Sequence, residues 1–441
     1  MHDRLSRRAF AETAARTAVS LALAGSVTGR NVLGANDRIG VGLIGAGDQG
    51  RYNLQDFIRT DQVDVIAVAD PHQLNLDRAL EMTDQRAKGY KDFRRVLDHK
   101  EIDAVIVATP DHWHAIPLLA ACAAGKDVYQ EKPLSHTLDE GRKMVEAAKQ
   151  SKRVVQIGTQ QRSGEHFQKA VEIVRSGKVG KVSGVETWIE WNTYPRVVED
   201  FPDTDPPAWL DWDLWLGPAP RHRYNHNRCL GSFRWYWDYA NGMVTDWGTH
   251  LLDVVLWAAA VDAPRTVYAT GGKYLLEDDT ETPDTLEVLY EFGPSAISGK
   301  GFLVRFSSHF NNSRGPDGHD HGMEFVGTKG TLLVDRGGFT VWPEGERVGG
   351  ERVPTAAVMH SDTSAQHYPH VLNFLDCVRS RQTPRSSIES GHRATSMGLM
   401  AAISYKLGRK LVWDGEREEF VGDPEANRLR TKEYRKPWVV S

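Results

Sequence analysis

The sequence is poor in cysteine, in long apolar runs and in excess charge of one sign. Its 441 residues include three cysteines and no CxxC pair, which excludes a disulfide framework and a zinc-ribbon type of metal site. The net charge of −5 leaves no basic surface for nucleic acid. No repeat, low-complexity tract or set of membrane spans is present. What remains is a globular chain long enough for two domains.

Residues 1–35 predict an export signal rather than part of the fold. Arg7 and Arg8 precede a mildly apolar stretch, and small residues lead to a candidate cleavage site at Ala35. A twin-arginine signal exports proteins that are already folded, so we expect a periplasmic or otherwise exported protein that acquires its cofactor in the cytoplasm. The alternative is an amphipathic N-terminal helix of a cytoplasmic enzyme.

A glycine-rich turn follows the first predicted strand, residues 39–44, and precedes a helix-compatible stretch. Gly45 permits the tight turn, Gly47 lets the backbone approach a pyrophosphate, and Gly50 lets the helix pack on the strand. The start of the helix offers free N–H groups to phosphates. The predicted contacts of this turn with a dinucleotide are Gly45, Ala46, Gly47, Asp48, Gln49 and Gly50.

A second buried strand, residues 63–69, ends at Asp70. A carboxylate in this place can accept hydrogen bonds from the ribose hydroxyls and would repel a 2′-phosphate, so the sequence predicts NAD. The neighbouring Pro71 and His72 leave NADP open. The alternative for the whole pattern is a structural glycine turn between a strand and a helix.

Strands and helices go on alternating through residue 158, which predicts a doubly wound parallel sheet in a nucleotide-binding α/β domain of residues 36–158. Ligands bind at the carboxyl ends of such strands. The side chains expected there are Thr109, Pro110, Asp111, His112, His114, Glu131, Lys132 and Gln160. With the exception of Asp111, we take all of them as cofactor contacts.

Three side chains suit hydride transfer from a carbinol, which needs one group to take the hydroxyl proton and others to hold the oxygen. Asp246 and His250 are four residues apart, so on a helix they share one face and the carboxylate can orient the imidazole. Lys132 ends a strand, and the proline after it restricts its backbone. The alternatives are a surface lysine before a turn, and a carboxylate at a helix N-terminus followed by a structural histidine.

Four motifs in order resemble the Gfo/Idh/MocA family, that of glucose–fructose oxidoreductase and inositol dehydrogenase. They are the glycine turn with Asp70, Thr109-Pro110 with His114, Glu131-Lys132-Pro133, and Asp246-Trp247-Gly248-Thr249-His250. The likeness runs from about residue 38 to about residue 415, and it is closest to members with a twin-arginine signal.

The resemblance implies that residues 159–441 form an α+β domain whose open, mainly antiparallel sheet covers the nicotinamide and binds a sugar or polyol. It implies that Lys132 polarises the reacting hydroxyl, that His250 is the acid/base and that Asp246 contacts substrate, although the roles of Lys132 and His250 could be exchanged. Homodimers or homotetramers are common in the family.

Residues 186–247 hold eight of the thirteen tryptophans, and this tryptophan-rich segment is predicted to be an insertion. Aromatic faces stack on the C–H face of a sugar, so the segment is a candidate carbohydrate cleft, although packing explains most single tryptophans. Trp188 and Arg162 complete the predicted substrate contacts. The histidine pairs lack a metal-ligand spacing, so we expect no metal.

The sequence therefore predicts an NAD-dependent oxidoreductase acting on a carbinol of a sugar, glycoside or polyol. Free dinucleotide is scarce outside the cytoplasm, so we expect an exported enzyme to hold and recycle its cofactor. One alternative is an NAD-dependent glycoside hydrolase or lyase, which works by transient oxidation and elimination. The other is a non-catalytic sugar-binding or sensor protein.

Overall fold

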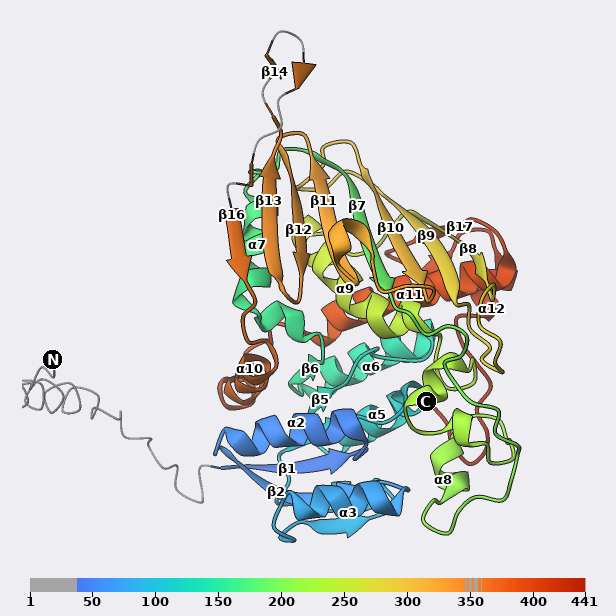
Figure 1. Cartoon of the computed structure of the whole chain (residues 1–441). Helices are drawn as coiled ribbons and strands as arrows, with labels where there is room; N and C mark the ends of the chain where they lie inside the picture. Colours follow the sequence, from blue (N-terminus) through green and yellow to red (C-terminus); the bar gives the residue numbers. More distant parts are fainter. Residues whose placement is uncertain (1–37, 346, 349–350, 353–355, 358, 441) are drawn as a thin grey trace, which may run out of the picture. The chain divides into compact units, whose positions relative to one another are not determined.

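The computed structural model describes residues 38–345, 347–348, 351–352, 356–357 and 359–440 (Figure 1). The predicted export signal, residues 1–35, lies outside the described residues. Among the helices that are described, none is long and apolar enough to cross a membrane.

A six-stranded parallel sheet in the order β3-β2-β1-β4-β5-β6 confirms the predicted doubly wound fold. Its strands are β1 (Ile39–Ile44), β2 (Val63–Ala69), β3 (Lys88–Tyr90), β4 (Ala104–Val107), β5 (Asp127–Gln130) and β6 (Val155–Ile157). The helices between them are α2 (Asp48–Arg59), α3 (Gln73–Glu81), α4 (Arg94–Leu97), α5 (Ala115–Ala123) and α6 (Leu138–Ser151). All six residues of β1 are buried, because helices cover both faces of the sheet. The strand order reverses between β1 and β4, where dinucleotides bind in such sheets.

The second sheet has ten strands in the order β16-β13-β12-β11-β7-β10-β9-β8-β17-β18. They are β7 (Val182–Glu190), β8 (Thr266–Gly272), β9 (Thr285–Phe292), β10 (Phe302–His309), β11 (His321–Gly327), β12 (Gly330–Asp335), β13 (Gly338–Pro343), β16 (Met359–Asp362), β17 (Leu411–Asp414) and β18 (Glu419–Phe420). A separate short hairpin consists of β14 (Arg347–Val348) and β15 (Glu351–Arg352). Only β7 and β10 pair in parallel in the ten-stranded sheet, so it is mainly antiparallel, as the resemblance implied.

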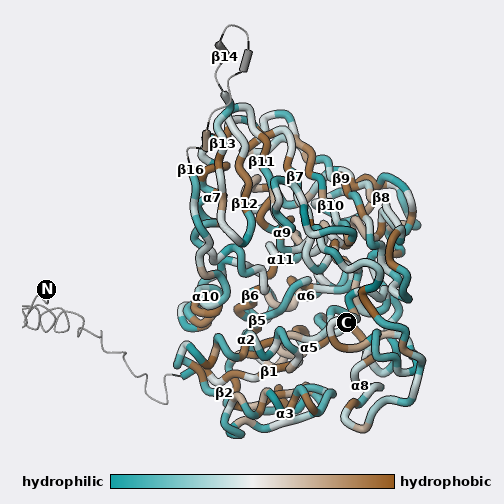
Figure 2. Tube along the Cα trace, viewed as in Figure 1, coloured by the Kyte–Doolittle hydropathy of each residue, from teal (hydrophilic) through white to brown (hydrophobic). Residues whose placement is uncertain are grey.

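One face of the second sheet packs on helices and the other stays open. Burial alternates along β9, as expected for a strand with one solvated face. The covering helices are α7 (Glu165–Arg175), α9 (Met243–Ala259) and α11 (Ile388–Leu407), whose apolar residues share one cluster with the strands. Figure 2 shows apolar segments along strands of both sheets, such as β1 and β12.

Two late segments of the chain pack on the parallel sheet. Helix α10 (His367–Ser380) places Phe374 and Leu375 in the cluster formed by β1 and α2. The C-terminal tail adds Val440 to the cluster on the opposite side, with Trp438 against it. Hydrophobic packing therefore crosses the boundary predicted after residue 158.

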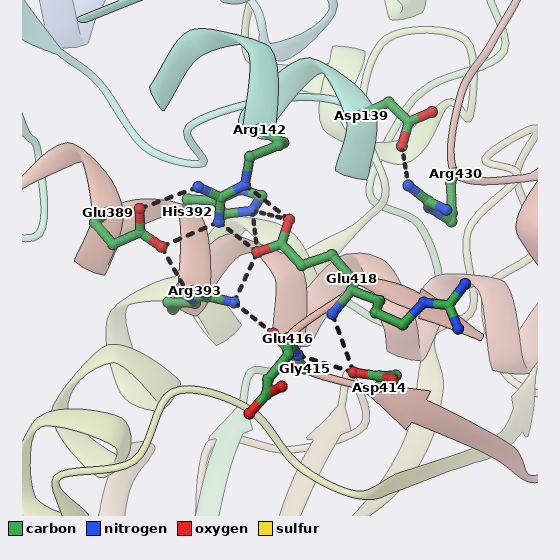
Figure 3. Close-up of polar contacts among 11 residues, drawn as sticks. Asp139, Arg142, Glu389, His392, Arg393, Asp414, Gly415, Glu416, Glu418 and Arg430 are labelled. Atoms are coloured by element: carbon green, nitrogen blue, oxygen red, sulfur yellow. Dashed lines mark hydrogen bonds and ion pairs between the residues drawn. The ribbon is translucent and has the colours of Figure 1, made fainter. Parts of the chain in front are cut away.

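An ion-pair network fastens α6 to α11 and to the hairpin of β17 and β18 (Figure 3). Arg142 of α6 donates to Glu389 at 3.0 Å and also to Glu418. Arg393 of α11 contacts the same two carboxylates at 2.9 and 2.7 Å, and His392 lies 3.0 Å from Glu418. Burial alone would raise the pKa of Glu418, but the His392 and Arg142 donors hold it well below its usual range. The network joins the last strands to the parallel-sheet half of the fold.

Candidate active site

The glycine turn between β1 and α2 has the shape of a phosphate cradle. Gly45 has a φ of +89°, and a Cβ there would lie 2.6 Å from the carbonyl of Ala108. A Cβ on Gly50 would lie 2.0 Å from the carbonyl oxygen of Gly45. A Cβ on Gly47 would meet nothing within 4 Å, so the space before the first turn of α2 is open. Gly45 therefore fits the tight turn, Gly50 the close packing of helix on strand, and Gly47 the approach of a ligand to the backbone.

A cavity extends from this turn to the carboxyl ends of β4 and β5. Nine of the predicted cofactor contacts line it: Gly45, Gly47, Asp48, Gln49, Asp70, Thr109, Pro110, Glu131 and Lys132. The cavity therefore runs from Asp70, the carboxylate predicted to bind the ribose, to Lys132, the predicted catalytic lysine. An extended dinucleotide requires a cavity of this kind.

The other predicted cofactor contacts do not line the cavity, and some of them hydrogen-bond to residues that do. Ala46 donates its N–H to Asp70, and Gln160 donates to Glu131 at 3.3 Å. The His114 ring bridges two loops, with its nitrogens 2.6 Å from the Pro133 carbonyl and 2.8 Å from the Thr109 carbonyl. His112 is buried, and its ring packs against Trp113, Trp215 and Tyr239 instead of lining the cavity.

Asp70 sits at the ribose end of the cavity. Its carboxylate accepts the N–H groups of Ala46 at 2.7 Å and of His72 at 2.8 Å, and each oxygen keeps room for a further donor. Burial raises the pKa of Asp70 to about 6, although these two N–H groups oppose the shift. The side chain is therefore ionised at neutral pH and becomes protonated in mild acid.

At the opposite end, Lys132 and Asp246 come together from 114 positions apart in the chain. The Lys132 Nζ lies 2.5 Å from Asp246 Oδ1, and the Arg234 Nε lies 3.1 Å from the same oxygen. Burial alone would raise the pKa of Asp246, but the two cations outweigh it and hold that pKa well below its ordinary value. Asp246 is therefore an ionised carboxylate that fixes the lysine ammonium.

His250 lies one turn beyond Asp246 on α9, as the four-residue spacing predicted. It is buried, and its Nδ1 has no hydrogen-bond partner among the described residues. Burial, with the charges of Lys132 and Arg336, holds the pKa of His250 well below its usual value. The imidazole is therefore neutral at pH 7, with an Nδ1 that no described residue engages.

Two family models cover both halves of the chain. The model described as "Oxidoreductase family, NAD-binding Rossmann fold" (GFO_IDH_MocA) matches residues 39–159, and the model described as "Oxidoreductase family, C-terminal alpha/beta domain" matches residues 165–289 and 355–440. The chain belongs to the Gfo/Idh/MocA oxidoreductase family.

Individual relatives support this membership. Myo-inositol 2-dehydrogenase of Thermotoga maritima is 24% identical over 87% of this chain and 99% of its own length. A glycosyl hydrolase family 109 protein of a Shewanella species is 28% identical, over 35% of this chain and 36% of that protein. A solved levoglucosan dehydrogenase, in complex with NADH and levoglucosan, has a TM-score of 0.63 and 17% identity, and covers 85% of this chain and 99% of that one. At this identity the last likeness shows the fold alone.

In this Gfo/Idh/MocA chain, the sequence prediction assigned no role to Asp111 and overlooked Arg234 and Arg336. Asp111 lines the cavity beside Lys132, and burial raises its pKa to about 7 against the opposing charge of Arg234. The position of Asp111 after β4 could have identified it as a site residue, because ligands bind at the carboxyl ends of these strands. Arg234 lies in the 3-10 turn Leu230–Trp235, and Arg336 lies between β12 and β13; neither belongs to a motif.

Two predicted substrate contacts, Arg162 and Trp188, do not lie with Lys132, Asp246 and His250. Arg162 forms an ion pair at 2.8 Å with the fully buried Asp253, which neutralises its charge. Trp188 is 1% exposed, and its Nε1 donates to the carbonyl of His319. A Cβ on Gly322 would lie 2.9 Å from the Trp188 ring, so the indole is enclosed within the sheet and has no face open to a sugar.

The tryptophan-rich segment covers the ribose end of the cavity. Its backbone pairs with the loop after β2, because Gln73 donates to the Trp209 carbonyl at 2.7 Å and Asp211 donates to the Pro71 carbonyl at 3.0 Å. The Trp209 ring lies 4.4 Å from the His72 ring. The residues of the segment that line the cavity are Leu214, Trp215, Leu230, Gly231, Phe233 and Arg234. Most other aromatic residues of the segment form its own buried cluster.

Within the described part of the chain, no group of three His, Cys, Asp or Glu side chains is placed to hold a metal ion. Cys122, Cys229 and Cys377 are all buried and free.

The raised pKa of Asp70 predicts a pH-dependent affinity for NAD. Ribose hydroxyls donate to a carboxylate, so protonation removes an acceptor as the pH falls through about 6. We expect the NAD dissociation constant to increase below that pH, approaching about tenfold per pH unit where only the ionised form binds. Titrating nucleotide-free protein between pH 4.5 and 8 measures this. The Asp70→Asn variant should bind weakly at every pH, and a wild-type affinity that stays constant would contradict the role of Asp70.

Proposed function

We propose that this chain is an NAD-dependent oxidoreductase that acts on a carbinol of a sugar, glycoside or polyol. The observation that carries the proposal is Lys132, which lines the far end of a cavity that begins at the glycine cradle. Asp246 and His250 do not line the cavity themselves: Asp246 pairs with Lys132 from behind the lining, and the neutral His250 lies one helical turn further along α9. The names of the relatives that act on myo-inositol and levoglucosan support this substrate class.

Lys132 and His250 have different roles in the proposed reaction: one binds the substrate oxygen and the other takes the hydroxyl proton. Bound NAD supplies the acceptor for the hydride that leaves the carbinol carbon. Lys132, held by Asp246, donates a hydrogen bond to the substrate oxygen, and His250 accepts the hydroxyl proton during oxidation and returns it during reduction. In the alternative assignment the two roles are exchanged, so that Lys132 is the base and His250 binds the substrate oxygen.

Absorbance at 340 nm tests the proposal directly. Purified protein with added NAD is offered a panel of sugars, polyols and glycosides, and we expect NADH formation with at least one of them. Glycoside cleavage with no net NADH would favour the hydrolase or lyase alternative, in keeping with the name of the Shewanella relative. Sugar binding with neither reaction would favour the non-catalytic alternative.

We also propose that the enzyme is exported and retains its nucleotide between turnovers. The tryptophan-rich segment supports retention, because its pairing with the loop after β2 covers the ribose end of the cavity. Retention in turn suits an exported protein, which meets little free dinucleotide.

Truncating Trp209 should accelerate nucleotide release. In Trp209→Ala the ring contact with His72 is lost, while the backbone hydrogen bonds of the segment can remain. We expect NADH to dissociate about tenfold faster, from the loss of one aromatic contact and its buried area. Displacement of bound NADH, followed by fluorescence, measures the rate. Trp342→Ala, in β13 of the second sheet, is the matched control, and equal rates in both variants would contradict a retaining role.

A further inference from the structure

One arginine next to the candidate catalytic residues forms no ion pair with any carboxylate of the described residues. Arg336 lies between β12 and β13, is partly buried, and stacks over Trp247 at 4.4 Å from the ring centroid. Among the described residues no carboxylate forms an ion pair with it, and its Nε has no hydrogen-bond partner. The adjacent Asp335 is engaged by His319 at 2.6 Å and by the Gly337 N–H at 2.7 Å.

Arg336 does not line the cavity but lies near His250 and Asp246. It stacks on Trp247, the residue after Asp246, and the charge of Arg336 helps to lower the pKa of His250. Burial and the nearby charge of Arg336 lower the pKa of His367, at the start of α10, whose ring lies 4.8 Å from that of Tyr52. Tyr52 is 46% exposed, and Trp247 and His367 are partly exposed, so solvent reaches the side chains that lie around Arg336.

No carboxylate of the described site forms an ion pair with Arg336, although the charge of Asp246 partly offsets the lowering of the Arg336 pKa by burial. Asp246 is already shared between Lys132 and Arg234. Glu131 accepts hydrogen bonds from the side-chain amides of Asn53 and Gln49 on α2. A partly buried cation without a partner is costly unless a ligand supplies the negative charge.

We propose that Arg336 binds an anionic group, a carboxylate or a phosphate, on the sugar that reacts at Lys132 and His250. A guanidinium presents a planar fork that matches either anion, and the contact of Arg336 with the Trp247 ring limits where that group can lie. The inference rests on the proposed function and narrows its substrate class to sugar acids, sugar phosphates or their glycosides.

Binding of three probes with the same ring tests the inference. D-glucose, D-glucuronate and D-glucose 6-phosphate are titrated into the NAD-loaded protein by calorimetry. We expect at least one anionic probe to bind about 10- to 100-fold more tightly than glucose, the range of a charged hydrogen-bonded contact. Whether the carboxylate or the phosphate is preferred identifies the anion.

Two variants of Arg336 and a control variant test whether the preference for the anionic probe depends on this residue. Arg336→Gln should reduce the ratio of anionic to neutral affinity to near one, and Arg336→Lys should keep part of it. With a substrate that turns over, KM should change more than kcat. Arg305→Gln, which removes an exposed arginine paired with Glu186 on the same sheet, should leave the ratio intact. Bound-nucleotide content and the melting temperature verify that each variant is folded.

Because binding is measured apart from turnover, the experiments can contradict the anion site at Arg336 without contradicting the proposed reaction, and the reverse. Equal affinity for all three probes, or an anionic preference that survives in Arg336→Gln, overturns the inference even if neutral sugars reduce NAD. A preference that depends on Arg336 with no NADH formed from any sugar supports the anion site and contradicts the proposed reaction.

Discussion

Replacing Lys132 by methionine lowers turnover about 100- to 10,000-fold, the range expected for loss of a group that assists proton transfer. Methionine keeps an unbranched side chain of nearly the same length but removes the donor to the reacting oxygen. Asp246 keeps Arg234 at 3.1 Å, so no buried carboxylate is left unpaired and the chain should fold. The measurement is the rate of NADH formation at saturating sugar, with nucleotide content determined on the same sample.

Lys410→Met is the matched control for Lys132, since Lys410 is an exposed lysine paired with Glu291 on the second sheet. It should retain wild-type turnover. A Lys132→Met protein that is as active as this control would remove the lysine from the mechanism.

Gly47→Val should abolish function by a different route, at the cofactor. The backbone of Gly47 has a φ of −60° and a ψ of −175°, which valine adopts easily, and a Cβ there meets no atom within 4 Å. The added side chain instead fills the space in which a pyrophosphate would approach the backbone. We expect NAD to bind about 100-fold more weakly, with an unchanged melting temperature for the nucleotide-free protein.

Gly184→Val is the control, because a Cβ on Gly184 in β7 also meets nothing within 4 Å but lies outside the lining of the cavity. Its NAD affinity should match the wild type. If Gly47→Val also binds NAD normally, the open space before α2 is not the phosphate site.

The parts of the site that depend on sheet topology were predictable from the sequence. The carboxyl ends of parallel strands meet at one edge of the sheet, so placing Thr109 and Glu131 after strands was enough to bring them to one cavity. Helical spacing likewise placed Asp246 and His250 on one face of α9.

The rest depends on contacts between distant segments, which periodicity does not encode. Arg234 reaches Asp246 from a long irregular segment, and Arg336 arrives from a turn of the second sheet. Trp188 belongs to the segment predicted to be an insertion, whereas the structure places it in β7, and which side of that strand faces the interior depends on how the sheet packs. Arg162 finds its partner Asp253 91 positions later in the chain.

The most direct test of the account is to mix the purified protein with the sugar panel, without added cofactor, and to measure the nucleotides released on denaturation. The account predicts close to one dinucleotide per chain, recovered as NAD without sugar and converted to NADH by an oxidisable one. Protein that releases no dinucleotide, and that also fails to bind or reduce added NAD, would contradict it.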